Sequence, residues 1–253
     1  MPSGAAPSTR PVPSPTIDRW LVRTPGSEDV ARLFCFPYSG AGASSFSGWP
    51  HRIAGAAVHP LQFPGRENRL AEPPFETYEE LVEALVPALG PHLDRPFAFF
   101  GHCTGALIAY ETTRRLAGLG LPGPRILFAS GQIAPQHADR DPMLTMTDDQ
   151  LRAEIVEFLR ERGIEPRPDI VAIGISVLRA DLRAARRYRC DDPAELACPI
   201  SVVRWRADTR TDPDLLARWS RCSTRTALHD LPGGQHGFGD APTELRRLLG
   251  SWR

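Results

Sequence analysis

Short apolar runs alternate with amphipathic segments along most of the chain. Six runs are rich in aromatic and branched residues and are bounded by turn-forming residues, which is typical of buried strands. They lie at residues 31–36, 57–63, 96–100, 125–130, 199–205 and 226–231. Apolar residues recur at helical spacing at 76–93, 105–118 and 214–220, and again from Thr243 onward. This alternation predicts an α/β fold with a mostly parallel sheet covered by helices on both faces.

The alternation breaks between about residues 133 and 190. Two or three helical patterns follow one another there without an apolar strand between them, among them TDDQLRAEIVEFLRER and PDIVAIGISVLRADLRAARRYR. They predict a helical insertion that lies over the strand ends as a lid. Residues 1–16 consist mainly of Pro, Ser, Ala and Thr, which bury too little to offset their ordering entropy. We therefore expect a disordered tail at 1–16 and one folded domain at 17–253.

Composition narrows the function without identifying it. The chain has 253 residues, of which 42% are hydrophobic and 24% charged, and its formal net charge is zero. A neutral chain of this size is typical of a single enzyme domain and argues against nucleic-acid binding. The sequence contains no Lys, so all 30 basic residues are Arg. A Schiff-base lysine, a phosphate-loop lysine and a Ser/Lys dyad are thereby excluded.

The five cysteines are odd in number and lack any CxxC spacing; they lie at positions 35, 103, 190, 198 and 222. They predict reduced thiols rather than a disulfide framework or a metal site. No apolar run approaches the roughly 18 residues that a membrane-spanning helix needs, and the N-terminus does not read as a signal peptide. We expect a soluble, cytoplasmic protein, and a monomer in the absence of any contrary signal.

One stretch carries the candidate chemistry, FFGHCTGALIAYETTRRL at residues 99–116. A strand pattern runs there into Gly-x-Cys-x-Gly and directly on into a helical pattern. Such a tight turn presents its central side chain, and the flanking Gly101 and Gly105 keep neighbouring atoms clear of it. The pattern predicts a nucleophile elbow with Cys103 as the nucleophile. At a helix N-terminus beside an imidazole, Cys103 is expected to have a lowered pKa.

A nucleophile of this kind needs a base and an acid that orients the base. His236 lies in the glycine-rich loop PGGQHGFGD after the last predicted strand, where a catalytic imidazole would be presented. Asp208 follows the strand ISVVRW in the polar loop RADTRTD and fits the order nucleophile, acid, His. Asp212 in the same loop is the reserve. The alternative for Asp208 is an ion pair with Arg206 or Arg210.

The developing oxyanion needs backbone donors. The N–H of Thr104, next after the nucleophile, supplies one, and the loop after the first strand supplies the other from Tyr38 or Ser39. His102 is a weaker candidate for the base, because adjacent residues at a sharp turn point apart. His229 lies within a predicted strand and is interpreted as structural.

Several long motifs follow one another from Arg32 to the C-terminus: RLFCFPYSGAGASSF, LQFPGRENRLAEPPF, DRPFAFFGHCTGALIAYE, LFASGQIAP, LRADLRAARRYR, CPISVVRWRAD and LPGGQHGF. On these motifs the chain resembles the type II thioesterases of polyketide and nonribosomal peptide pathways, within the α/β-hydrolases. The resemblance implies an editing enzyme that removes acyl groups from the phosphopantetheine arm of acyl or peptidyl carrier proteins, without a cofactor of its own. It implies that Cys103, Asp208 and His236 occupy the triad positions.

Two departures from the family pattern bear on mechanism. The family usually has GHSMG where this chain has GHCTG, and PGGHFF where it has PGGQHGF. Attack by Cys on a thioester yields another thioester, which a second thiol attacks more readily than water does. Hydrolysis through an acyl-Cys103 is thus the first hypothesis, and transfer of an acyl or aminoacyl group between carrier proteins is the second. A third is an inactive protein that binds carriers.

The second lid pattern carries a run of arginines, which has two interpretations. The run comprises Arg179, Arg183, Arg186, Arg187 and Arg189. It could meet a phosphate or an acidic partner surface, or form a solvated helix face.

Overall fold

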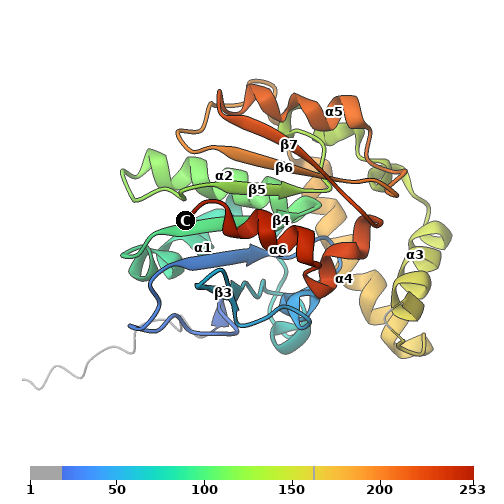
Figure 1. The fold of residues 1–253 in the computed structure, drawn as a ribbon. Coiled ribbons are helices and arrows are strands. Elements are labelled where there is room, and N and C mark those ends of the chain that lie inside the picture. Colours follow the sequence, from blue (N-terminus) through green and yellow to red (C-terminus); the bar gives the residue numbers. More distant parts are fainter. Residues whose placement is uncertain (1–18, 162) are drawn as a thin grey trace, which may run out of the picture.

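The computed structural model describes residues 19–161 and 163–253, so the predicted tail at 1–16 lies outside the described residues. Within them, seven strands form one sheet in the order β2-β3-β1-β4-β5-β6-β7 (Figure 1). The strands are β1 Arg32–Phe36, β2 Arg52–Ile53, β3 Ala56–Pro60, β4 Phe97–His102, β5 Leu127–Ser130, β6 Ile200–Trp205 and β7 Thr226–Leu231. Every neighbouring pair is parallel except β2 with β3. The predicted α/β fold with a mostly parallel sheet is confirmed.

The central strands are apolar because both of their faces are covered. All residues of β1 and β4 are buried, which is what parallel strands between two helical layers require. In the edge strand β7, half of the residues are exposed and only Leu231 is buried, although its sequence was also interpreted as a buried strand. The two-residue β2 at the opposite edge was not predicted, because so short a strand has no periodicity to detect.

Helices form a layer on each side of this sheet. They are α1 Tyr78–Leu89, α2 Thr104–Gly118, α3 Asp148–Glu161, α4 Pro168–Arg187, α5 Pro213–Ala217 and α6 Thr243–Gly250. Apolar residues of α1, α2 and α5 pack in one cluster with Phe34 and Phe99, while α6 packs in a second cluster with Leu33 and Phe100. Alternate residues of the same strands thus supply the two halves of the core. Thr77 is the N-cap of α1 and accepts a 3.1 Å hydrogen bond from the Glu80 N–H, as its sequence position predicts.

Between β5 and β6, all the regular secondary structure of the described residues is helical. Two 3₁₀ turns, Pro135–Arg140 and Pro142–Thr145, lead into α3 and α4, which lie beyond one end of the sheet (Figure 1). The two helices pack on each other through Leu159, Val171 and Ile175. These apolar residues therefore hold the two lid helices together.

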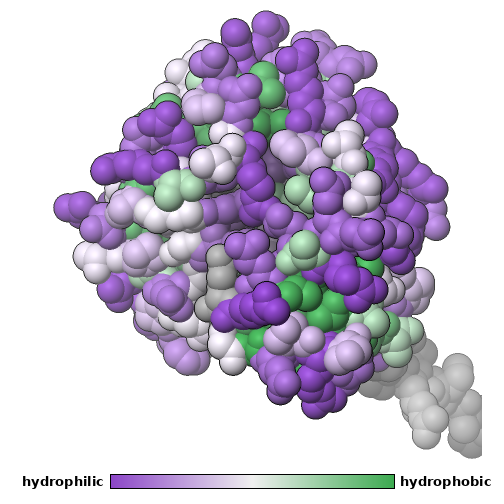
Figure 2. Space-filling model, turned by 90° about the vertical axis from the view of Figure 1, so that its right-hand side faces the viewer, coloured by the Kyte–Doolittle hydropathy of each residue, from purple (hydrophilic) through white to green (hydrophobic). Residues whose placement is uncertain are grey.

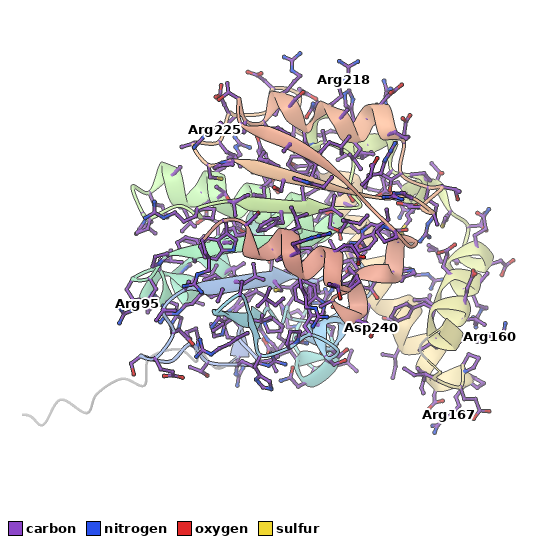
Figure 3. The ribbon with its side chains drawn as sticks, in the orientation of Figure 1. Arg95, Arg160, Arg167, Arg218, Arg225 and Asp240 are labelled. Atoms are coloured by element: carbon purple, nitrogen blue, oxygen red, sulfur yellow. The ribbon has the colours of Figure 1, made fainter. Side chains whose placement is uncertain are left out.

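The face of the molecule that carries the lid is mainly hydrophilic, with a hydrophobic patch in its lower part (Figure 2). Arg160 and Arg167 lie at its far tip and point away from the sheet (Figure 3). Ile164 and Ile173 are exposed by 45% and 49% on this part of the chain. Among the described helices, none is long and apolar enough to cross a membrane.

Candidate active site

Cys103 occupies a strained turn between β4 and α2. Its φ of 48° and ψ of −132° lie outside the usual regions for a residue with a side chain, at a cost of about 1–3 kcal/mol. A Cβ on Gly101 would lie 2.4 Å from the Gly105 carbonyl oxygen, and one on Gly105 would lie 2.4 Å from the Phe36 carbonyl oxygen. Both glycines are therefore required by close backbone approach, which is the geometry expected of a nucleophile elbow.

The thiol of Cys103 lies in a dry environment. Cys103 is only 4% exposed, and this burial raises the pKa of its thiol to about 12, with a further upward contribution from the Asp141 carboxylate. The hydrogen bond from the Thr104 N–H lowers the pKa but is outweighed. The expectation of a lowered pKa is therefore wrong, because burial raises the pKa of the thiol by more than the N-terminus of α2 lowers it. Cys103 is a neutral thiol at pH 7.

The structure brings Asp208 and His236 to one cavity. His236 lies in the 3₁₀ turn Gln235–Asp240 after β7, and Asp208 lies just after β6. Both line a cavity of about 660 Å³ between the sheet edge and α3. The His236 ring centroid is 5.3 Å from that of Phe158 on α3 and 5.8 Å from that of Tyr38. The half-buried imidazole thus contacts both the lid and the loop after β1.

Cys103 lines a second, smaller cavity, which also lies at the carboxyl ends of the strands. This cavity shares Gln235 and Arg210 with the first. Gln235 precedes His236, and Arg210 belongs to the Asp208 loop, so the three predicted triad residues come from loops that meet at the carboxyl ends of β4, β6 and β7. Ligand sites in parallel α/β sheets lie at these ends.

Hydrogen bonds distinguish Asp208 from Asp212. The Asp208 carboxylate accepts from the Arg210 backbone N–H at 2.9 Å and from the Thr211 hydroxyl at 2.6 Å. The Arg210 guanidinium pairs with Glu154 on α3 instead of with Asp208. Asp212 accepts from the Asp214 N–H at 2.9 Å and is the N-cap of α5. Asp212 therefore serves a helix end, whereas Asp208 faces the cavity.

The two segments expected to supply oxyanion donors touch each other. The Ser39 hydroxyl lies 2.9 Å from the Thr104 hydroxyl, in a hydrogen bond between the loop after β1 and the start of α2. Tyr38, Ser39 and Thr104 also line one small internal cavity. Loop and elbow are thus fixed relative to each other.

His102 and His229 lie outside this arrangement. His102 is fully buried, its ring stacks on Phe238 at 4.0 Å, and its Nδ1 lies 3.0 Å from the Ser130 hydroxyl. Burial holds the pKa of His102 well below its usual value, so it stays neutral and supports the floor of the site. His229 on β7 lies 3.4 Å from the Ser201 hydroxyl on the neighbouring strand.

A buried ion pair beside the site was not identified from the sequence. Arg66 and Asp181, both more than nine-tenths buried, form a bidentate pair between the segment after β3 and lid helix α4. Both residues lie in motifs of the resemblance, PGRENR and LRADLR. One feature of the sequence could have indicated this pair: the acidic residue Asp181 lies on the apolar face of α4, among Val177, Leu178 and Leu182.

The arginines of α4 mostly have partners within the chain. Arg179 pairs with Asp148, Arg187 pairs with Glu76, and Arg186 donates to the Leu144 carbonyl. These contacts fasten α4 to neighbouring segments, so they favour the interpretation of a solvated helix face.

Another cavity lies at the amino ends of β4, β5 and β6. It measures about 1330 Å³ and is lined by residues that begin or precede strands, including Phe97, Arg125 and Pro199. Its walls carry ion pairs such as Arg115 with Glu83. No group of three or more His, Cys, Asp or Glu side chains suited to a metal occurs in the part of the chain that the structure describes.

Comparison with known proteins gives matches over most of the chain. Residues 31–251 match the family model described as thioesterase domain. A probable cadicidin biosynthesis thioesterase of Streptomyces griseus is 36% identical over 207 residues, which are 81% of this chain and 57% of that protein. The gramicidin S biosynthesis protein GrsT of Aneurinibacillus migulanus is 34% identical over 235 residues, which are 88% of each chain.

A solved structure gives the same result in three dimensions. The RedJ thioesterase from the prodiginine pathway of Streptomyces coelicolor is 35% identical and superposes with a TM-score of 0.76. The match covers 92% of this chain and 96% of RedJ.

Proposed function

The chain belongs to the thioesterase domain family, and from that premise we propose that it cleaves acyl or aminoacyl thioesters from the phosphopantetheine arm of carrier proteins in polyketide or nonribosomal peptide biosynthesis. The observation that carries the proposal is the strand–Cys103–helix elbow, with the loops of Asp208 and His236 at the same sheet edge. Acyl or peptidyl carrier proteins are the partners. The arm belongs to the carrier, so the chain itself needs no cofactor, and it acts as a cytoplasmic monomer.

In the first half-reaction, the Cys103 sulfur attacks the thioester carbonyl while its proton passes to His236. The coupling of these two events follows from the protonated resting thiol. Asp208 orients the imidazole and stabilises its positive charge. The N–H groups of Thr104 and of Tyr38 or Ser39 hold the oxyanion. Collapse expels the pantetheine thiolate, which takes the proton from His236 and leaves acyl-Cys103.

The second half-reaction decides between two activities. In hydrolysis, His236 removes a proton from water, the hydroxyl adds to the acyl-Cys103 carbonyl, and free acid leaves as the thiol is restored. In transfer, the pantetheine thiol of a second carrier attacks instead. The cysteine at the elbow favours transfer as the second candidate, because acyl-Cys retains the reactivity of a thioester.

The test follows one acyl group through every species by intact mass. A carrier protein loaded with an acyl or aminoacyl thioester is mixed with the enzyme, with and without a second unloaded carrier. Free acid alone supports hydrolysis, and label on the second carrier supports transfer. The Cys103→Ala variant is the matched control and should carry no acyl mass. Absence of acyl mass on wild-type Cys103, with the carrier unchanged, would leave only the inactive carrier-binding protein.

A further inference from the structure

Asp181 joins the lid to the loop after β1. It lies in α4, is 4% exposed, and its Oδ2 accepts a 2.7 Å hydrogen bond from the Gly40 N–H. Gly40 has a φ of 81°, a conformation that residues with side chains rarely adopt. A single lid carboxylate thus holds the turn directly after Tyr38 and Ser39.

Arg66 completes this attachment from a third segment. Its guanidinium donates to both Asp181 oxygens, at 2.7 and 2.8 Å, and to the Ala41 carbonyl at 3.0 Å. The Arg66 guanidinium also lies over the rings of Phe63 and Phe75, at 5.7 and 5.6 Å from their centroids. The loop is therefore held at Gly40 by Asp181 and at Ala41 by Arg66.

The same loop contacts the elbow through the Ser39–Thr104 hydrogen bond of 2.9 Å. A continuous path of contacts runs from α4 through Asp181 and Gly40 to Ser39, and from there to Thr104 beside the nucleophile. One small cavity is lined jointly by Tyr38, Ser39, Thr104, Arg66 and Asp181. The ion pair thus borders the predicted oxyanion donors.

A buried ion pair such as Arg66–Asp181 adds little to the stability of a fold. Desolvation of two buried charges offsets much of their attraction, and apolar replacements of similar volume are often as stable. A buried carboxylate with a backbone N–H and a fork of guanidinium donors does, however, fix positions closely.

We propose that Asp181 is a positioning residue for acyl-enzyme formation, which aims the backbone donor of the Tyr38–Ser39 loop at the oxyanion formed when Cys103 attacks. The proposal rests on the proposed function for its nucleophile. The lid then takes part in the chemistry through a fixed contact, besides covering the substrate.

The decisive variant is Asp181→Asn, which keeps the size of the side chain and removes its charge. Two reactions of Cys103 are compared in single-turnover experiments: acylation by p-nitrophenyl acetate, which forms an oxyanion, and alkylation by iodoacetamide, which does not. We expect acylation to slow by about 10- to 100-fold, as for a displaced oxyanion donor. The rate of alkylation should stay within about twofold of wild type, since the thiol is untouched. The concentration of loaded carrier that gives half-saturation should also stay within about twofold, since the docking surface is untouched.

Asp148→Asn is the matched control, because it breaks an exposed lid pair with Arg179. It should change neither reaction. Acylation of Asp181→Asn within about threefold of wild type would overturn the proposal, and so would an equal slowing of acylation and alkylation, which indicates a general structural role.

A double variant covers the case in which Asp181→Asn fails to fold. Arg66→Met with Asp181→Leu removes the pair without leaving an unpaired buried charge, and should retain the fold and normal alkylation. It should still acylate slowly, and acylation at the wild-type rate would refute the positioning role. Wild-type protein that reacts with the small ester but not with any loaded carrier would instead refute the proposed function and leave this inference standing.

Discussion

At the scale of single residues, the surroundings of Cys103 determine how the nucleophile is activated. A low-pKa thiolate would be ready before substrate arrives, whereas a buried neutral thiol gives up its proton only as the new bond forms. The raised pKa of about 12 places Cys103 in the second class. A thiol of this class needs a base that takes its proton as the bond forms, and His236 is the candidate for that base.

The first prediction concerns the pH dependence of Cys103 alkylation. The folded-state pKa is raised, so the thiolate fraction grows about tenfold per pH unit at every pH below it. Iodoacetamide labelling of Cys103, followed by peptide mass spectrometry, should therefore accelerate about tenfold per unit from pH 7 to pH 9. A rate that is already flat at neutral pH would instead indicate a thiolate–imidazolium pair.

The second prediction separates the two candidate acids. Asp208→Asn should slow acylation of Cys103 by about 10²- to 10⁴-fold, because the imidazole loses its orientation and its stabilising charge. Asp212→Asn should leave acylation unchanged, and since Asn also caps helices, it should leave stability within about 0.5 kcal/mol. Burst kinetics and thermal unfolding measure both effects. The reverse result would make Asp212 the acid.

At the scale of elements, the elbow depends on how closely α2 approaches β1. Gly105→Ala would place a methyl group 2.4 Å from the Phe36 carbonyl oxygen and 2.6 Å from that of Pro37. We expect a loss of about 1–3 kcal/mol in the free energy of unfolding, together with loss of acylation, because the strand and helix must separate. Chemical denaturation and burst kinetics give the two readouts.

Gly118→Ala in the last turn of the same helix is the matched control. A Cβ at Gly118 would have no atom within 4 Å, and Ala exceeds Gly in helix propensity by about 1 kcal/mol. It should be neutral or stabilising. If both variants lost the same free energy, close packing at the elbow would not be the cause.

The sequence predicts elements well where one periodic pattern determines them. The strands β1 and β4 and the helix α1 follow from apolar spacing and from the Thr77 cap, which are local properties. The Arg66–Asp181 pair joins residues 115 positions apart. No local sequence pattern predicts which arginine pairs with which carboxylate over such a separation. The Cys103 pKa also escaped prediction, because it depends on how tightly separate loops close over the thiol.

At the scale of the whole molecule, the sheet, the lid and three loops bring the candidate site residues to the carboxyl ends of the strands, in two cavities that share Gln235 and Arg210. The candidate catalytic residues were predicted from chain order, since the carboxyl ends of parallel strands lie along one side of the sheet. The position of His236 within its loop was harder to predict, because this chain has PGGQHGF where the family usually has PGGHFF. The structure places Gln235 toward Cys103 and His236 in the cavity with Asp208.

The last prediction concerns the outcome of the entire reaction. Cys103→Ser converts the intermediate from a thioester to an oxygen ester, which a second carrier thiol attacks less favourably. If the native reaction is transfer, the variant should release mainly free acid and label little of the acceptor carrier. Intact mass of both carriers measures the ratio. Efficient transfer by the serine variant would show that the sulfur is not the reason for transfer.

The burial of Cys103 has a consequence beyond catalysis. Peroxide oxidises cysteine through the accessible thiolate, and the damage runs from sulfenic to irreversible sulfinic and sulfonic acids. A side chain that is 4% exposed, with a pKa near 12, offers little of that species to the solvent. The burial that raises the pKa of the Cys103 thiol is therefore also expected to protect it from oxidation.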